Sequence, residues 1–132
     1  MSPLVVDASV LVELLLGSPA SPLIRSALLG RTAVAPQHLD AELISALRAL
    51  VRRGDVLEAR ARLALTRLST AAVERFPLPP LLADAWTLRD NLSSYDALYV
   101  ALARRLRCPL LTSDVRLAGA PGLGVPVTLL RA

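Results

Sequence analysis

Residues 93–114, SSYDALYVALARRLRCPLLTSD, join a helical pattern to a short strand pattern, and this stretch decides the fold. Its first part carries one apolar stripe at helical spacing, made of Ala97, Leu98, Ala101, Leu102 and Leu106. Pro109 prevents the helix from continuing, and residues 110–112 form an apolar run typical of central strands. A helix that leads back into a strand is half of a βαβ unit. We therefore expect Asp96, in the first helical turn, and Asp114, just past the strand, to meet at one side of the sheet.

The composition predicts a single domain with an aliphatic core. Of the 132 residues, 54% are hydrophobic and only 3% are aromatic, and a chain of this length suits one domain, residues 1–132. Cys108 is the single cysteine, which excludes an intramolecular disulfide and favours a reducing compartment. The apolar run 10–16 is interrupted by Glu13 and is too short to cross a bilayer. We therefore expect a cytoplasmic protein.

The charged residues exclude several classes of site. The net charge is +4, and every basic residue is arginine. Without lysine there is no catalytic amine, no P-loop nucleotide site and no receiver-like phosphoacceptor site. A haloacid-dehalogenase-like phosphatase would need an aspartate two residues after Asp7, where Ser9 stands. The basic balance is compatible with a polyanionic partner such as nucleic acid.

Strand patterns alternate with helical patterns along the chain. We expect strands at residues 4–6, 33–35, 73–76, 110–112 and 125–130. We expect further helices at residues 8–16, 21–29, 38–53, 55–70 and 81–90. Asp55 and Glu58 have the spacing of a capping box at the start of the fourth of these helices. The alternation predicts an α/β fold, with a central, mostly parallel sheet of about four or five short strands flanked by helices.

Four acids fall at one edge of this predicted sheet. Asp7 ends the first strand, Glu42 lies early in the helix after the second strand, and Asp96 and Asp114 were placed above. Sites in parallel sheets form outside the carboxyl ends of the strands. Each acid alone could simply cap a helix or close a turn. Together, four converging carboxylates repel one another unless a cation lies between them, and their oxygen donors suit Mg²⁺ or Mn²⁺.

Polar and aromatic neighbours surround these acids in the sequence. The hydroxyls of Ser9, Thr112 and Ser113 either cap the backbone or orient the carboxylates beside them. His38 lies one turn before Glu42 and either approaches the site or is a surface or capping residue. Tyr95 and Tyr99 are two of the four aromatic residues, and one of them either stacks on a base or packs against a neighbouring helix. Asp40, by contrast, should point away from the face of Glu42, because residues two apart are not neighbours on a helix.

Three segments in order, VVDASVLVELL, HLDAELISALRALVRRG and SYDALYVALARRLRCPLLTSDVRLA, resemble PIN-domain ribonucleases of the VapC toxin type. The resemblance implies a PIN-like α/β/α sandwich and an endoribonuclease that depends on Mg²⁺ or Mn²⁺. It also implies a prokaryotic cytoplasmic toxin, commonly a homodimer, that a VapB-like antitoxin holds inactive.

The family's functional positions carry over to this sequence residue by residue. Its acidic positions fall on Asp7, Glu42, Asp96 and Asp114. Its hydroxyl positions fall on Ser9 and on Thr112 or Ser113. Some relatives have a further acid shortly after the last one. This chain has Arg116 and Leu117 there instead, so a second metal ion would lack that ligand.

These residues predict hydrolysis of RNA phosphodiester bonds. Asp7, Asp96 and Asp114 would hold one divalent ion. Glu42 would complete the ion's shell or bind a second ion, and either Glu42 or Asp96 would orient or deprotonate the attacking water. The resemblance implies products with 5′-phosphate and 3′-hydroxyl ends. The alternative is a PIN-like module that binds RNA or a partner protein without cutting.

The helices at 38–53 and 55–70 offer a surface for a partner. They are rich in leucine and alanine, and six arginines line parts of them: Arg48, Arg52, Arg53, Arg60, Arg62 and Arg67. Guanidinium groups suit bidentate pairing with phosphate or carboxylate. We expect some of them, Arg48 and Arg52 in particular, to contact RNA or an acidic segment of the antitoxin. The alternative is a solvated helix face.

Overall fold

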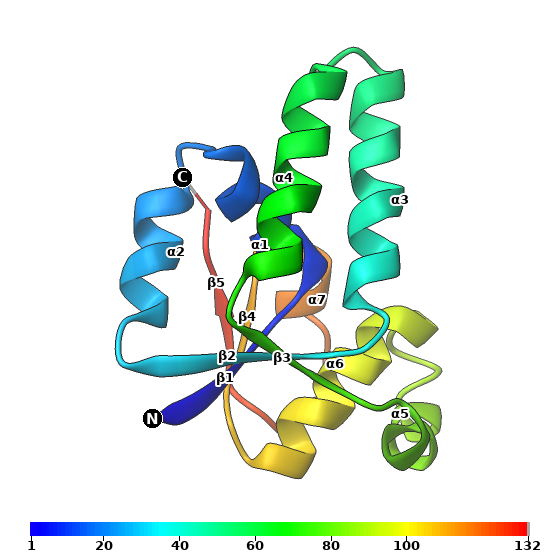
Figure 1. Ribbon diagram of the computed structural model, residues 1–132. Helices are drawn as coiled ribbons and strands as arrows, with labels where there is room; N and C mark the ends of the chain where they lie inside the picture. Colours follow the sequence, from blue (N-terminus) through cyan, green and yellow to red (C-terminus); the bar gives the residue numbers. More distant parts are fainter. Residues whose placement is uncertain (132) are drawn as a thin grey trace.

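The computed structural model describes residues 1–131 and contains one five-stranded sheet (Figure 1). The strands are β1 (Ser2–Val6), β2 (Arg31–Pro36), β3 (Val73–Phe76), β4 (Leu110–Thr112) and β5 (Val127–Leu129). Their order across the sheet is β3-β2-β1-β4-β5, and every neighbouring pair is parallel. The predicted α/β class is therefore confirmed, with a wholly parallel sheet.

Helices cover both faces of this sheet. They are α1 (Ala8–Leu16), α2 (Ser21–Leu28), α3 (Leu39–Arg52), α4 (Glu58–Thr70), α5 (Leu82–Thr87), α6 (Ser94–Leu106) and α7 (Val115–Ala118), with a 3-10 turn η1 (Pro79–Leu81). Right-handed crossovers place the connections from β1 to β3 on one face and the connection from β3 to β4 on the other. Figure 1 shows this arrangement, with α1, α3 and α4 on one side of the strands and α5 and α6 on the other. The result is an α/β/α sandwich.

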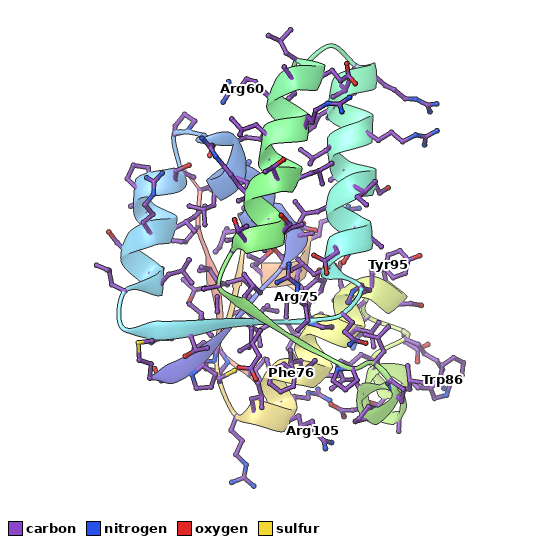
Figure 2. All side chains as sticks on the ribbon, in the orientation of Figure 1. Arg60, Arg75, Phe76, Trp86, Tyr95 and Arg105 are labelled. Atoms are coloured by element: carbon purple, nitrogen blue, oxygen red, sulfur yellow. The ribbon has the colours of Figure 1, made fainter. Side chains whose placement is uncertain are left out.

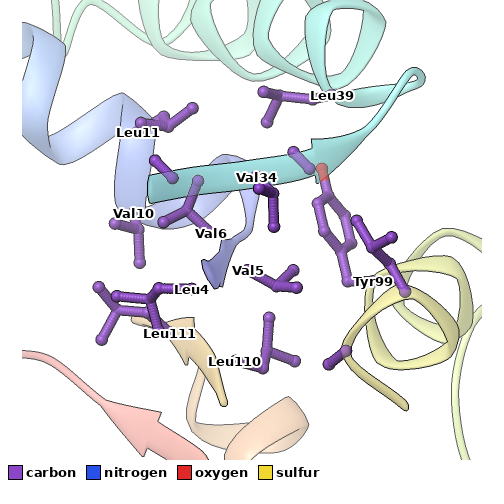
Figure 3. Packing of buried hydrophobic residues seen from close by; sticks show 14 of the residues in the cluster. Leu4, Val5, Val6, Val10, Leu11, Val34, Leu39, Tyr99, Leu110 and Leu111 are labelled. Atoms are coloured by element: carbon purple, nitrogen blue, oxygen red, sulfur yellow. The ribbon is translucent and has the colours of Figure 1, made fainter. Parts of the chain in front are cut away.

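The core is aliphatic, as the composition predicts. Central strands are apolar on both faces because helices cover both faces. Val5 and Val6 of β1 and Leu110 of β4 are completely buried. Figure 3 shows these side chains between α1 and α6, with Tyr99 as the aromatic residue among them.

The direction of the chain across the sheet reverses between β1 and β4. Connections from β1 run toward β3, whereas the chain re-enters on the other side of β1 as β4. Loops from opposite faces therefore separate at the carboxyl ends of these two strands and leave a crevice. Asp7 and Asp114 follow these two strand ends.

Two predicted boundaries were wrong. Helix α4 begins at Glu58, and its N-cap residue Leu57 makes no side-chain cap, so the expected capping box is absent. Asp55 instead pairs with Arg53 at 3.1 Å, after Gly54 has turned the chain at a φ of 80°. The helix expected at residues 81–90 is shorter, since α5 ends at Thr87. No helix within residues 1–131 is long and apolar enough to span a membrane.

Candidate active site

Asp7 is the most buried acid of the candidate site, with 4% of its surface exposed. It follows β1 and caps α1, because its Oδ1 accepts a hydrogen bond from the backbone N–H of Val10 at 3.1 Å. The hydroxyl of Ser9 donates to the same oxygen at 2.5 Å, and the hydroxyl of Thr112 donates to Oδ2. Three donors therefore fix the orientation of this carboxylate. Asp7 thus caps α1 and also lies in the candidate site.

The three residues predicted to orient the carboxylates lie around Asp7: Ser9, Thr112 and Ser113. Ser113, however, takes part through its backbone and not through its hydroxyl. Thr112 is fully buried at the end of β4, and its Oγ1 also accepts the backbone N–H of Asp114 at 3.0 Å. Ser113 contributes its backbone N–H, which donates to Ser9 Oγ at 3.1 Å. The hydroxyls of Ser9 and Thr112 thus orient the carboxylate of Asp7, and the backbone of residues 113 and 114 holds those hydroxyls.

Asp96 and Asp114 begin helices beside this crevice. The hydroxyl of Ser93 accepts the backbone N–H of Asp96 at 3.2 Å, so Ser93 caps α6. Asp114 precedes α7, and its Oδ1 accepts the backbone N–H of Arg116 at 2.9 Å. Asp114 therefore closes a turn, as one of the two predictions for it stated. It also lies at the predicted edge of the sheet, just after β4.

Asp7 and Asp96 lie close enough to other acids for those charges to raise their pKa values. Burial raises the pKa of Asp7; its three hydrogen bonds oppose that rise, and the charge of Asp96 adds to it. Burial also raises the pKa of Asp96, followed by the negative charge of Asp114. Glu42 raises the Asp96 pKa further, whereas the Ser93 hydrogen bond and Arg116 lower it. The structure thus brings together the four acids that the topology placed at one edge.

Glu42, in the first turns of α3, lies between two aromatic side chains. Its Oε1 is 3.1 Å from Nε2 of His38, and this oxygen is buried without a hydrogen bond of ordinary geometry. The hydroxyl of Tyr99 is also buried without such a bond. Burial and the nearby charge of Glu42 raise the pKa of Tyr99, so Tyr99 stays protonated. The sequence placed Tyr99 beside Tyr95 as a residue that stacks on a base or packs against a helix, and did not predict its place beside Glu42. The signal was its position three residues after Asp96, which puts both on one helix face.

The donor chemistry of this site fits a hard divalent cation. All four acids offer oxygen ligands, which Mg²⁺ and Mn²⁺ prefer. The raised pKa values of Asp7 and Asp96 and the unpartnered oxygen of Glu42 are features that a bound cation would relieve. As their side chains stand, however, no three acidic, histidine or cysteine residues within residues 1–131 lie close enough together to hold one ion.

Arg116 is the cation nearest to these acids. It lowers the pKa of Asp96, and both residues line a polar hollow of about 240 Å³ together with Asn91 and Ser93. The guanidinium makes no ion pair within residues 1–131.

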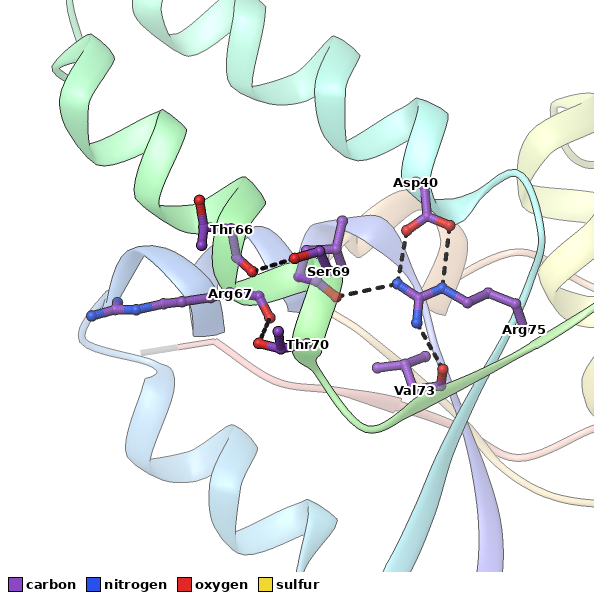
Figure 4. A network of polar contacts seen from close by, with 8 residues as sticks. Asp40, Thr66, Arg67, Ser69, Thr70, Val73 and Arg75 are labelled. Atoms are coloured by element: carbon purple, nitrogen blue, oxygen red, sulfur yellow. Dashed lines mark hydrogen bonds and ion pairs between the residues drawn. The ribbon is translucent and has the colours of Figure 1, made fainter.

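Asp40 is excluded from the site by an arginine. Its two oxygens accept hydrogen bonds from Arg75 of β3 at 2.8 and 3.2 Å (Figure 4). Arg75 also donates to the carbonyl of Val73. Asp40 therefore anchors α3 to the edge of the sheet, in agreement with the prediction that it points away from Glu42.

Tyr95 and two arginines remain available at the surface. Tyr95 is 61% exposed at the start of α6, and Figure 2 shows it near the first turn of α3. Arg48 and Arg52 line a groove between α3 and α4 of about 430 Å³ and make no side-chain hydrogen bond within residues 1–131. Arg60 and Arg67 differ, because they donate to the carbonyls of Leu16 and Leu15 at the end of α1. These two arginines therefore also tie α4 to the end of α1.

Comparison with known proteins places the chain in a family. The model of the PIN domain matches residues 4–123. Over 133 residues the chain is 45% identical to Ribonuclease VapC1 of Mycobacterium tuberculosis, with 99% of this chain and 100% of that protein covered. The chain belongs to the VapC family of PIN-domain ribonucleases. It is also 37% identical over 126 residues to Ribonuclease VapC12 of the same organism, covering 96% of this chain and 98% of that protein.

A solved structure supports the same fold for this VapC-family chain. VapBC2 from Rickettsia felis, bound to a DNA fragment from the promoter, matches with a TM-score of 0.70 at 12% identity. The match covers 98% of this chain and 99% of that one. At this identity the match shows the fold alone. The predicted family, the sandwich fold and the enzyme class of the VapC family are thus confirmed.

Proposed function

We propose that this VapC-family chain is the toxin of a VapBC-type toxin–antitoxin pair and hydrolyses RNA with the help of Mg²⁺ or Mn²⁺. One observation carries the proposal. Four carboxylates lie at the switch point of a parallel sheet, and two of them have raised pKa values in the absence of any lysine: Asp7, Glu42, Asp96 and Asp114.

Each acid has a separate task in this proposal. Asp7, Asp96 and Asp114 would hold the divalent ion, and Glu42 would complete its shell. A bound divalent ion would stabilise negative charge on the phosphate and make water more acidic. Asp7 is immobile because Ser9, Thr112 and Val10 hold it. Asp96 is less buried than Asp7, so Asp96 or Glu42 would orient the attacking water and accept its proton.

Arg116 favours a single ion at the site. Its charge already acts on Asp96, at a place where a second ion would need another carboxylate. A guanidinium there would instead attract a phosphate of the RNA. We infer that one ion is held between Asp7, Asp96 and Asp114.

The groove between α3 and α4 supports a VapB-like antitoxin as partner. Its floor is apolar, with Leu47, Val51 and Ala61, and Arg48 and Arg52 stand at its border. Such a groove suits an amphipathic segment with acidic residues. Tyr95, exposed beside the acids, would contact RNA. The homodimer and the cytoplasmic location that the resemblance implies stay predictions.

The direct test is cleavage of a panel of structured RNAs by purified protein with Mn²⁺, Mg²⁺ or EDTA. We expect cleavage with either ion, none with EDTA, and products that carry 5′-phosphate ends. Calorimetry should show binding of Mn²⁺ to the metal-free protein. Protein that neither cleaves nor binds a metal would contradict the proposal and favour the binding module without catalysis.

A further inference from the structure

One imidazole connects the two helices that carry Glu42 and Asp96. Nε2 of His38 lies 3.1 Å from the backbone carbonyl oxygen of Tyr95 and 3.1 Å from Oε1 of Glu42. His38 directly precedes α3, one turn before Glu42, and Tyr95 is the neighbour of Asp96 in the first turn of α6. The contact therefore joins α3 to α6 at the level of these two acids.

The ring of His38 is held firmly in this position. Its side chain is only 9% exposed. The ring centroid lies 4.7 Å from that of Tyr99 and 5.7 Å from that of Tyr95, with both pairs tilted. The Nδ1 atom is buried without a partner. A bare lone pair costs less there than an unpaired N–H, so the ring proton belongs on Nε2, from which it donates to Tyr95.

Helix capping does not explain this histidine. His38 is the N-cap residue of α3, but its side chain makes no capping hydrogen bond to the helix. Its only hydrogen bond within residues 1–131 crosses to another helix. The role of the ring must therefore be sought between α3 and α6.

The topology explains why the acids need such a connection. Asp7 and Asp114 follow neighbouring strands, and the ladder between β1 and β4 sets their separation, with the backbone N–H of Asp7 donating to Leu111. Glu42 and Asp96 instead begin helices on opposite faces of the sheet. No ladder fixes the distance between these two carboxylates. Side chains must do so, and His38 lies at the junction.

We propose that His38 is a positioning residue of the ribonuclease. Its Nε2–H bond to Tyr95 fixes the start of α3 against the start of α6 and so holds the Glu42 carboxylate beside Asp96. Tyr99 packs against the ring from the α6 side and keeps water from it. This inference rests on the proposed function, because the spacing of the two acids matters for catalysis only if the acids perform it.

Two isosteric variants separate positioning from packing. The side-chain amide nitrogen of His38→Gln reaches about as far as Nε2, whereas that of His38→Asn reaches only as far as Nδ1. We expect His38→Gln to keep kcat within about threefold of the wild type. His38→Asn and His38→Ala should lower kcat by about 10- to 100-fold, with a small change in KM, as for other residues that orient ligands.

The kinetic comparison is made at saturating Mn²⁺ and at a temperature where thermal unfolding shows every variant folded. Equal kcat values for His38→Gln and His38→Asn, or a wild-type kcat in His38→Ala, would overturn the inference. If His38→Ala does not fold, the Gln and Asn variants still decide. A wild-type protein that cuts no RNA contradicts the proposed function instead, so the two failures are distinguishable.

A second readout needs neither metal nor activity. His38 is the only histidine in the chain, so its ring nitrogen signals can be assigned without ambiguity in a ¹⁵N NMR spectrum. In metal-free protein we expect a proton on Nε2, a bare Nδ1 and slow exchange of the ring proton with water. A ring whose two nitrogens share a rapidly exchanging proton would overturn the inference.

Discussion

The hydroxyl of Thr112 donates a hydrogen bond to Oδ2 of Asp7, and this contact joins the ends of β4 and β1 across 105 positions of the sequence. Ser9 donates to the other oxygen of the same carboxylate and accepts the N–H of Ser113. The hydroxyl and carboxylate groups that follow β1 and end β4 thus form one hydrogen-bonded unit. A buried carboxylate held in this way keeps its orientation before any substrate or ion arrives.

Replacing Thr112 tests the importance of this orientation. Thr112→Val keeps the shape of the side chain but removes the donor to Asp7. We expect RNA cleavage to fall by about 10- to 100-fold and the free energy of unfolding to fall by about 1–3 kcal/mol. Ser113→Ala is the matched control, because Ser113 contributes only its backbone N–H. Wild-type activity in Thr112→Val would show that the carboxylate needs no such support.

The raised pKa of Asp96 makes a prediction about stability. At pH values above 3.8, the ordinary pKa of an aspartate, the folded protein binds more protons at Asp96 than the unfolded chain does. The free energy of unfolding therefore falls as the pH rises from 3.8 through the raised folded-state pKa. At neutral pH the ionised Asp96 destabilises the metal-free fold, mainly through its burial and through repulsion from Asp114.

We therefore expect metal-free Asp96→Asn to unfold at a higher temperature than the wild type at pH 7. The difference should disappear near pH 3, where the wild-type carboxyl is protonated. Addition of Mn²⁺ should raise the unfolding temperature of the wild type more than that of the variant. Thermal unfolding curves at the two pH values check all three expectations, and a variant less stable than the wild type at pH 7 would contradict them.

Arg48 and Arg52 make a prediction about the partner surface. If they contact RNA phosphates, Arg48→Ala and Arg52→Ala should each reduce the slope of log affinity against log salt by about 0.7. Arg25→Ala is the control, because Arg25 is exposed on α2 and does not line the groove between α3 and α4. Affinity measured from low to moderate salt decides the question. Unchanged slopes would assign the two arginines to the antitoxin or to solvent.

The topology and the edge positions of the acids could be predicted from local patterns. Asp7 and Asp114 directly follow apolar strands, so placing the strands also places these acids. Asp96 follows the cap residue Ser93 in the first turn of a strongly periodic helix. Parallel pairing then brings their strand ends to one edge, because the carboxyl ends of parallel strands coincide.

Contacts between elements could not be predicted in the same way. Arg60 and Arg67 look like parts of a basic surface, yet they donate to carbonyls 44 and 52 positions away at the end of α1. The contact of His38 with Tyr95 spans 57 positions and depends on how two layers pack. The capping box failed for a local reason, since the chain stays extended at Leu57 after the turn at Gly54.

The most direct test of the central claim compares two acid-to-amide variants under single-turnover conditions. Asp96 lies near Asp114 and Glu42, whose charges raise its pKa, whereas Asp40 is paired with Arg75 away from the crevice. With Mn²⁺ present and both variants folded, we expect Asp96→Asn to abolish RNA cleavage and Asp40→Asn to cleave at close to the wild-type rate. Cleavage by Asp96→Asn at the wild-type rate would contradict the assignment of the carboxylate cluster as the catalytic centre.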